Sequence, residues 1–239
     1  MKRLNDPALV RDEYADESNF AVRAAAWDSA TGPDPKELAF AAVAEAGPGR
    51  VLEAGCGRGE LAERIQRELG AEVIAVDQSE RMVELTLARG VQALVGDVQE
   101  LPLADGSFDC AVAAWMLYHV PDLDRGLGEL ARVLHPGGRL VAVTNSNENL
   151  RELWRLFGKR ARRDHPFSAE NGEELLRRHF RRVERRESRG TVTFPDWDAA
   201  RSYVAASTSR AHLAGELPPF QGPFVASRHV TVFVAETAA

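Results

Sequence analysis

The chain has 239 residues, of which 44% are apolar, and its formal net charge is −6 at pH 7. This length suits one domain of ordinary size with a full hydrophobic core, and the acidic balance argues against a general polyanion binder. No stretch approaches the roughly 18 apolar residues of a membrane-spanning helix, so we expect a soluble, cytoplasmic protein. Cys56 and Cys110 lack metal-ligand spacing and are interpreted as small buried residues.

Residues 1–47 are predicted to form a helical cap or lid ahead of the first core strand. The segment breaks at Gly32-Pro33-Asp34-Pro35, and an alanine-rich stretch from Lys36 to Ala46 then ends at Gly47-Pro48-Gly49. Glycine and proline just beyond a periodic stretch are typical of a helix terminus. The sheet is therefore expected to begin after residue 48.

A glycine-rich turn between a short strand and a helix is the first chemical motif. The strand is predicted over Val51 to Ala54 and the helix over Glu60 to Leu69. Glycine lets a backbone approach a ligand closely at positive φ, and the first N–H groups of the helix point into the turn. A nucleotide-like ligand is expected there.

The spacing of the glycines narrows the choice of ligand. Counting from Gly55 and Gly57, a dinucleotide fingerprint needs its third glycine at position 60, which is Glu60. Gly59 comes one residue too early, and no Gly-Lys-Ser/Thr follows as a P-loop requires. Glu53 at the strand end would repel a pyrophosphate and would suit a ligand that carries an ammonium group.

Further motifs follow in order. A buried strand from Val73 to Val76 ends at Asp77, about 20 residues after the turn, where a Rossmann-like fold places a carboxylate for ribose hydroxyls. Gly96-Asp97-Val98 ends a third strand, and Leu-Pro-Leu-Ala-Asp-Gly-Ser-Phe-Asp leads into the apolar run from Cys110 to Leu117. With Leu-Tyr-His-Val after it, the stretch from Arg50 to Asn145 resembles the class I S-adenosylmethionine-dependent methyltransferases, in particular their ubiquinone/menaquinone-type small-molecule branch.

The resemblance implies an α/β fold, a Rossmann-like seven-stranded, mostly parallel sheet whose last strand is antiparallel, with helices on both faces. It also implies S-adenosyl-L-methionine as cofactor and S-adenosyl-L-homocysteine as product. Asp77 would accept from the ribose hydroxyls, Asp97 from the adenine amine, and Glu53 would act on the methionine ammonium. The expected cofactor-binding residues are Arg23, Glu53, Ala54, Gly55, Gly57, Asp77, Gln78, Met82, Asp97, Val98 and Ala114.

Catalysis in such an enzyme rests on holding an acceptor in line behind the methyl group. His119 is the best-placed general base, with Tyr118 beside it, although it could instead only shape the pocket. By the resemblance, Tyr14 would lie over the sulfonium and Arg23 would pair with the methionine carboxylate. Packing on the sheet and a surface ion pair are the alternatives for these two residues.

No metal is expected, because the positions after the fourth and fifth strands hold few carboxylates. They contain Trp115-Met116-Leu117-Tyr118 and Asn145-Ser146-Asn147, whereas Mg²⁺ and Ca²⁺ prefer carboxylate-rich oxygen sites.

The C-terminal half is predicted less sharply. Helices are expected over Glu148 to Arg160 and over Asn171 to Phe180, the second with a capping box from Asn171 to Glu174. Strands are expected over Arg182 to Glu187 and Val230 to Val234. The core then spans 48–189, an insertion over 190–228 covers the substrate pocket or makes a dimer contact, and 229–239 is the last strand and tail of a single domain.

Several functions stay open. The first is methyl transfer to an O or N atom of a small molecule, such as a secondary metabolite, by a monomer or homodimer. A tRNA-modifying methyltransferase is an alternative, since residues 151–189 contain thirteen Lys or Arg against seven Asp or Glu, although solvated helix faces explain such runs and nucleic acid is not the expected partner. A non-methylating user of the cofactor and a non-catalytic binding module are the others.

Overall fold

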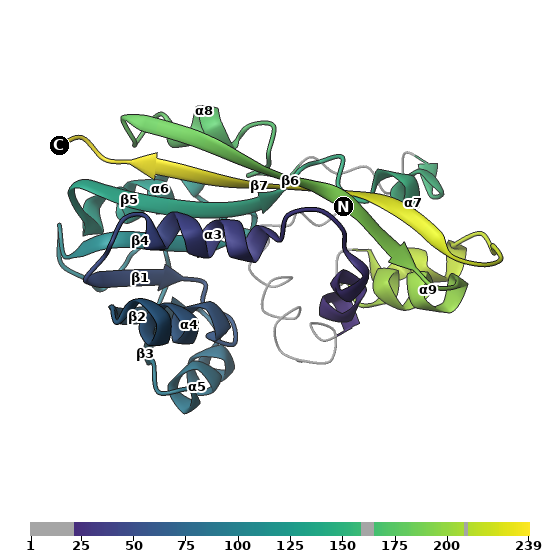
Figure 1. Ribbon diagram of the computed structural model, residues 1–239, viewed down its shortest axis with the longest axis horizontal. Coiled ribbons are helices and arrows are strands. Elements are labelled where there is room, and N and C mark those ends of the chain that lie inside the picture. The colour runs from purple at the N-terminus through teal and green to yellow at the C-terminus, as the bar shows by residue number, and fades with distance from the viewer. Residues whose placement is uncertain (1–21, 159–164, 208–209) are drawn as a thin grey trace.

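We analysed a computed structural model of the chain, which describes residues 22–158, 165–207 and 210–239. A seven-stranded sheet with the order β3-β2-β1-β4-β5-β7-β6 runs through it (Figure 1). The first five strands are parallel, and β7 is antiparallel to both of its neighbours. The predicted fold class is confirmed. The strands are β1 (Arg50–Ala54), β2 (Glu72–Asp77), β3 (Gln92–Val95), β4 (Phe108–Ala114), β5 (Leu134–Asn145), β6 (Arg182–Phe194) and β7 (Phe224–Glu236).

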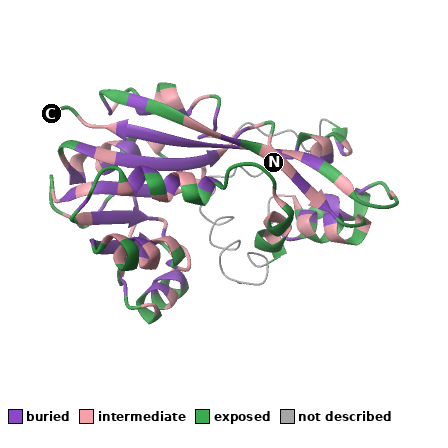
Figure 2. Ribbon diagram, viewed as in Figure 1, coloured by how far each residue is buried: buried purple, intermediate pink, exposed green. Residues whose placement is uncertain are grey.

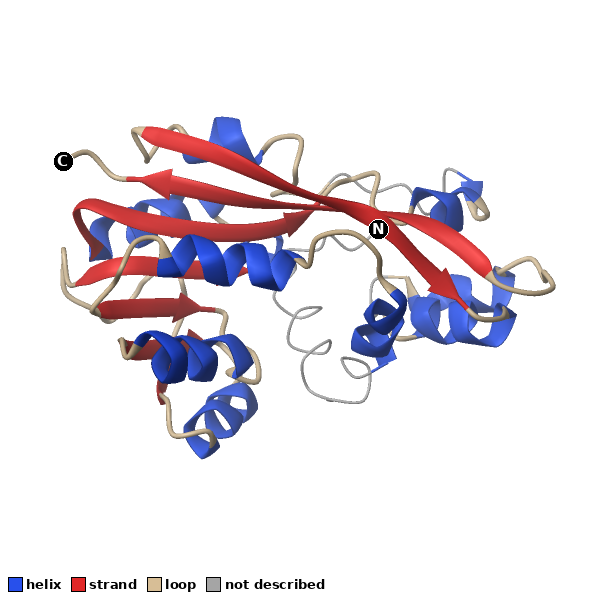
Figure 3. Cartoon of the chain, viewed as in Figure 1, coloured by secondary structure: helices blue, strands red, loops and turns tan. Residues whose placement is uncertain are grey.

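Helices cover both faces of the sheet (Figure 3). One core cluster joins α3 and α4 to one face, and a second joins α6 and α8 to the other. Figure 2 shows the central strands largely buried between these layers, whereas the edge strand β6 is mostly exposed or half-buried. The helices are η1 (Ala26–Ser29), α3 (Pro35–Ala44), α4 (Glu60–Leu69), α5 (Glu80–Ala88), η2 (Leu117–His119), α6 (Leu123–Val133), α7 (Arg151–Arg155), α8 (Gly172–Leu176), α9 (Trp197–Ala205) and η4 (Ala211–Glu216).

Side-chain caps explain where several helices begin. Asp34 accepts from the Lys36 N–H with Pro35 in the first turn, and Ser79 and Asp122 cap α5 and α6. Such caps satisfy the free N–H groups of the first turn. The capping box at Asn171 is wrong, because the Asn171 side-chain oxygen accepts from the Ser168 N–H at 2.7 Å instead.

The C-terminal strands are longer than predicted and the two preceding helices are shorter. The register of β6 and β7 runs unbroken from Arg182 opposite Glu236 to Phe194 opposite Phe224. Only the part of β7 from Val230 to Glu236 pairs with β5. The rest of the hairpin therefore projects past the end of β5, and residues 190–194 and 224–228, which we had assigned to an insertion, are strand.

The projecting ribbon carries its own apolar cluster, called here the lid cluster. Its buried members come from α7, the ribbon, α9 and η4, and Trp27 of η1 packs against them. They are Leu150, Leu153, Phe157, Val192, Phe194, Ala200, Val204, Leu213, Ala214, Leu217 and Ala226. In Figure 1, α7, α9 and the purple turns of η1 lie on the side of the molecule toward which the arrowheads of β1 and β5 point.

Candidate functional site

The carboxyl ends of β1, β2 and β4 meet at one edge of the sheet. Ala54 lies opposite Val76 in the register, and Glu53 lies opposite Val112. The turn after β1 is tied to β2, because the Gly55 N–H donates to the Val76 carbonyl at 2.7 Å. Ligands of open parallel sheets bind in the crevice at this edge, between strands whose connections diverge.

The glycine turn is shaped so that one glycine borders open space. Gly55, Gly57 and Gly59 have φ of 69°, 54° and 73°. A methyl group added at Gly55 would lie 2.7 Å from Met116 Cβ, and one at Gly59 would lie 2.6 Å from Thr86 Oγ1. At Gly57 it would meet no atom of the described residues within 4 Å. The positive φ values require glycine, and the backbone at Gly57 is open to a ligand.

Glu53 is a buried carboxyl beneath this turn. Its exposed fraction is 3%, and its Oε2 has no hydrogen-bond partner among the residues that the structure describes. Burial raises the pKa of Glu53 to about 8, and the carboxylates of Asp77 and Glu60 push it in the same direction, whereas the Ala62 N–H counteracts them. A buried oxygen without a donor suits a cationic or N–H ligand group at this place.

Two further carboxylates follow β2 and β3. Asp77 accepts from the Gly57 N–H and the Ser79 N–H, both at 2.9 Å, and burial raises the pKa of Asp77. Asp97 accepts from the Gln99 N–H at 2.9 Å and from the Gln99 side-chain amide. Each carboxylate has two oxygens with several acceptor positions, so both retain capacity for ligand hydroxyl and amine groups.

The segment after β4 forms the other wall of the edge. Trp115 has a φ of 55°, a strained value for a bulky residue, and its indole N–H donates to the Asn145 side chain at 3.3 Å. The Tyr118 ring packs edge-on against His119, at 4.5 Å between centroids, and against His165 at 5.5 Å. Strained backbone at the end of a central strand is a common mark of a functional site.

The other predicted cofactor residues are spread over this edge and the lid. Ala54 ends β1 and Ala114 ends β4, while Gln78 is exposed after β2. Met82 and Val98 are buried, at 5% and 4% exposure. Arg23 lies with the lid, where its guanidinium donates to the Ala206 carbonyl at 2.9 Å. Tyr14 lies outside the described residues.

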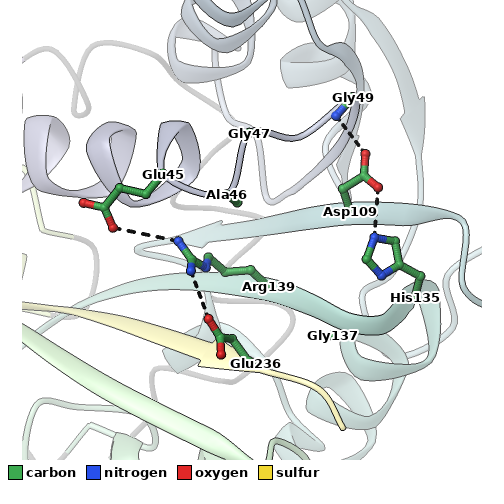
Figure 4. Close-up of a pocket in the computed structure, with 9 residues that line it drawn as sticks. All are labelled: Glu45, Ala46, Gly47, Gly49, Asp109, His135, Gly137, Arg139 and Glu236. Carbon is green, nitrogen blue, oxygen red and sulfur yellow. Dashed lines mark hydrogen bonds and ion pairs between the residues drawn. The ribbon is translucent and has the colours of Figure 1, made fainter. Parts of the chain in front are cut away.

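A polar cavity of about 370 Å³ lies at the opposite edge of the sheet (Figure 4). There Asp109 accepts from the Gly49 N–H at 2.8 Å and contacts His135 Nε2 at 2.9 Å. Arg139 lies 2.9 Å from Glu236 and 3.8 Å from Glu45. These contacts join the start of β4 and β5 to the end of β7, at the edge of the sheet opposite the glycine turn, so the cavity is separate from the edge described above.

The comparisons with known proteins indicate the family. The profile of a methyltransferase domain matches residues 52–142. An uncharacterised methyltransferase of Mycobacterium tuberculosis is 40% identical over 116 residues, 46% of this chain and 47% of that protein. A ubiquinone biosynthesis O-methyltransferase of Xanthomonas oryzae is 33% identical over 159 residues, 60% of this chain and 66% of that protein. The matched domain and these relatives support a class I S-adenosylmethionine-dependent methyltransferase.

Solved methyltransferase structures share the fold. One from Thermotoga maritima, described as a possible histamine N-methyltransferase, is 26% identical with a TM-score of 0.56 and covers 95% of both chains. The phosphoethanolamine N-methyltransferase 2 of Haemonchus contortus, in complex with S-adenosyl-L-methionine, has a TM-score of 0.66 at 19% identity and covers 100% of this chain and 61% of that one. This chain spans about half the length of the mycobacterial relative.

The structure brings to the glycine turn further residues that the sequence analysis did not identify. Thr86 on α5 and Arg89, directly after α5, contact the glycine turn, and Trp115 has a strained backbone after β4. One signal was available for Thr86: it follows Met82 and Val83 at helical spacing, so a hydroxyl occupies a buried position of an amphipathic helix. Leu87, the next residue, points away from that buried side and is 51% exposed.

Among the described residues, no three His, Cys, Asp or Glu side chains gather in a way that would hold a metal ion. Within the same ranges no helix has the length and apolar character to cross a membrane.

Proposed function

We propose that this protein is an S-adenosylmethionine-dependent methyltransferase that methylates an O or N atom of a small molecule. The observation that carries the proposal is the pairing of an open backbone at Gly57 with an unsatisfied carboxyl oxygen of Glu53 beneath it. The residues present therefore fit a ligand with both a close-lying backbone contact and a cationic end. The family match over residues 52–142 supports this choice of ligand.

Each side chain then has a role in holding the cofactor. Asp77 accepts from ribose hydroxyls, Asp97 accepts from the adenine amine while the Val98 N–H donates to the ring, and Glu53 acts on the methionine ammonium. Charged hydrogen bonds of this kind are each worth about 1.5 to 3 kcal/mol. Met82 packs beside the adenine. Arg23, which now donates to the lid, would have to leave Ala206 to pair with the methionine carboxylate.

The bound cofactor supplies a methyl group activated by a sulfonium, which the acceptor displaces in line. The protein has to orient the acceptor and exclude water, and orientation alone can lower a barrier by about 7 to 11 kcal/mol. His119, with Tyr118 packed on it, is placed after β4 to take a proton from an alcohol, phenol or ammonium acceptor. Tyr14 remains part of this catalytic proposal.

The lid cluster is proposed to cover the acceptor. It projects beyond the end of β5, and Figure 3 shows the β1 arrowhead pointing to its side of the molecule. Two relatives are named as a malonyl-[acyl-carrier protein] O-methyltransferase and a ubiquinone biosynthesis O-methyltransferase, and a solved neighbour as a possible histamine N-methyltransferase. We therefore propose a small organic acceptor, a secondary metabolite among the candidates, for this chain.

The arginine-rich segment supports a small acceptor over tRNA. Arg177 and Arg178 lie 2.8 and 3.1 Å from Glu173 and Glu174, and Arg185 lies 2.8 Å from Glu187. Carboxylates beside these cations cancel the field that would attract phosphates. Binding of tRNA that weakens steeply with salt would reverse this choice.

The test is calorimetric binding of S-adenosyl-L-methionine and S-adenosyl-L-homocysteine to the wild type and to Asp77→Ala. We expect micromolar binding that weakens about tenfold or more in the variant, as losing roughly 1.4 kcal/mol requires. Asp109→Ala is the matched control, because Asp109 also accepts from two backbone N–H groups, of Gly49 and Arg50, but at the opposite edge. A wild type that binds neither compound would refute the proposal.

A further inference from the structure

Thr86 on α5 is a fully buried polar residue that contacts the glycine turn. Its exposed fraction is 0%, and its hydroxyl donates to the Gly57 carbonyl at 3.2 Å. The same oxygen lies 3.4 Å from Cys56 Sγ. Burial raises the pKa of Cys56 to about 12, which keeps its thiol protonated, and the thiol also lies 3.8 Å from the Gly57 carbonyl oxygen.

Arg89, the C-cap residue of the same helix, binds the next carbonyl of the turn. Its Nε donates to the Arg58 carbonyl at 2.7 Å, and its Nη1 lies 2.6 Å from the Glu63 carboxylate. Thr86 and Arg89 are three residues apart and so lie on one side of α5. Two consecutive carbonyls of the turn are therefore each bound by a side chain of this helix.

The backbone of Gly57 is therefore held through both its N–H and its carbonyl. The Gly57 N–H donates to Asp77 at 2.9 Å and its carbonyl accepts from Thr86. Glycine at positive φ has more conformational freedom than any other residue, so without these bonds the turn would sample other peptide orientations. The Thr86 side chain also fills the space beside Gly59, where an added methyl would lie 2.6 Å from its hydroxyl.

We infer that Thr86 and Arg89 form a clamp that pre-organises the glycine turn for the cofactor, with Thr86 as the main positioning residue. The inference rests on the proposed function and deepens it. Neither side chain has to touch the ligand. A clamp lowers the ordering cost of binding because the turn is already held in its binding conformation.

The experiment compares Thr86→Val with Thr86→Ser by calorimetric binding of S-adenosyl-L-homocysteine. Valine keeps the branched shape and removes the hydroxyl, whereas serine keeps the hydroxyl. We expect Thr86→Val to weaken binding about tenfold, in the range of one lost hydrogen bond, and Thr86→Ser to bind within about threefold of the wild type. Hydrogen exchange at residues 57–59 of the ligand-free protein should be faster in Thr86→Val only.

Thr144→Val is the matched control. Thr144 is also 0% exposed, and its hydroxyl donates to a backbone carbonyl, that of Phe167, at 2.9 Å. A role in stability alone predicts that both valine variants lower the melting temperature and that neither changes the dissociation constant. Equal affinity of Thr86→Val and the wild type would therefore overturn the clamp and leave the proposed function intact.

Arg89→Gln keeps the test decisive if Thr86→Val does not fold. The Arg89 side chain is 30% exposed, so its replacement should be tolerated, and we expect it to weaken binding several-fold and to speed exchange at residues 57–59. Unchanged affinity and exchange in Arg89→Gln would overturn its part in the clamp. If the wild type does not bind S-adenosyl-L-homocysteine, the proposed function and the clamp are both overturned.

Discussion

The Glu53 carboxyl combines two demands that oppose each other. It is buried at the end of β1 with one oxygen unsatisfied among the described residues, which costs stability unless the group is neutral. Holding a ligand ammonium requires the ionised form. Burial raises the pKa of Glu53 to about 8, so the ligand-free protein keeps the proton near neutral pH and ligand binding should release it.

Replacing this carboxyl should therefore stabilise the ligand-free protein and weaken ligand binding. Below pH 4.5 Glu53 is protonated in both the folded and unfolded states. Between 4.5 and about 8 only the unfolded chain loses the proton, so the stability contribution of Glu53 is lost as pH rises through this window. We expect the unfolding free energy of Glu53→Gln at pH 8.5 to exceed that of the wild type by on the order of a few kcal/mol, so the variant should melt at a higher temperature there. Near pH 5 the two proteins should melt at similar temperatures.

The same variant should bind S-adenosyl-L-methionine more weakly, because the amide carries no charge to offset the ammonium. Glu60→Gln is the control, since Glu60 starts α4 nearby but its side chain is 50% exposed. A pH-independent difference in melting temperature between Glu53→Gln and the wild type would contradict the assignment of the raised pKa.

Residue types at strand ends were predictable, and contacts between distant elements were not. Glu53, Asp77 and Asp97 follow apolar strands, so their place at one edge followed from the parallel topology. The bond from Thr86 to Gly57 spans 29 residues and depends on how α5 packs, which no local pattern records. The contact between Arg23 and the Ala206 carbonyl joins residues 183 positions apart in the chain, and no local pattern records it either.

The β6–β7 hairpin is the element that separates this chain from a plain seven-stranded core. The segment before α3 crosses it, because the Thr31 N–H donates to the Thr191 carbonyl at 2.9 Å. The buried Arg228 guanidinium, on β7, donates to the Thr31 and Pro33 carbonyls at 2.6 and 2.8 Å. This crossing ties the segment that leads into α3 to the base of the lid.

A methyl group at the crossing should separate the two segments. On Gly190 it would lie 1.9 Å from the Thr31 carbonyl oxygen, a backbone atom that a side-chain rotation cannot move away. We expect Gly190→Ala to lower the unfolding free energy by roughly 1 to 3 kcal/mol, the usual cost of overpacking, in urea titrations. Gly215→Ala is the control, since a methyl there meets no described atom within 4 Å. Equal stability of the two variants would show that the crossing adapts freely.

The helices and strands of the core were predicted closely because each carries its own signals. The predicted helix from Glu60 to Leu69 is α4 to the residue, and Ser79 caps α5. The helix expected over Glu148 to Arg160 is reduced to α7, Arg151–Arg155, among the described residues. Apolar spacing there serves the lid cluster rather than a long helix, so tertiary packing overrode the local pattern.

At the scale of the whole molecule, the apolar interior is divided. Two clusters fill the faces of the sheet, and the lid cluster packs separately around the projecting ribbon. Regions with few contacts to the rest of a protein open locally at lower free energy than global unfolding. An active-site cover needs this property, because it must admit the acceptor and then exclude water.

The division predicts different effects for one substitution at two sites. Leu153 in the lid cluster and Leu140 in the sheet are both 0% exposed, so replacing either by alanine removes about 2 to 5 kcal/mol of packing. We expect Leu153→Ala to speed native-state hydrogen exchange in α7, α9 and the hairpin ends while β1, β4 and β5 keep wild-type protection. Leu140→Ala should lower the protection of the slowest core amides.

The two variants serve as controls for each other, because residue type, burial and substitution are the same. A single cooperative unit would lower core protection equally in both, since every slow amide would then exchange through the same global unfolding. Adding S-adenosyl-L-homocysteine sharpens the test. It should slow exchange at the glycine turn in both variants, because binding stabilises the native state by mass action, and it should leave the lid of Leu153→Ala the faster-exchanging part of the protein.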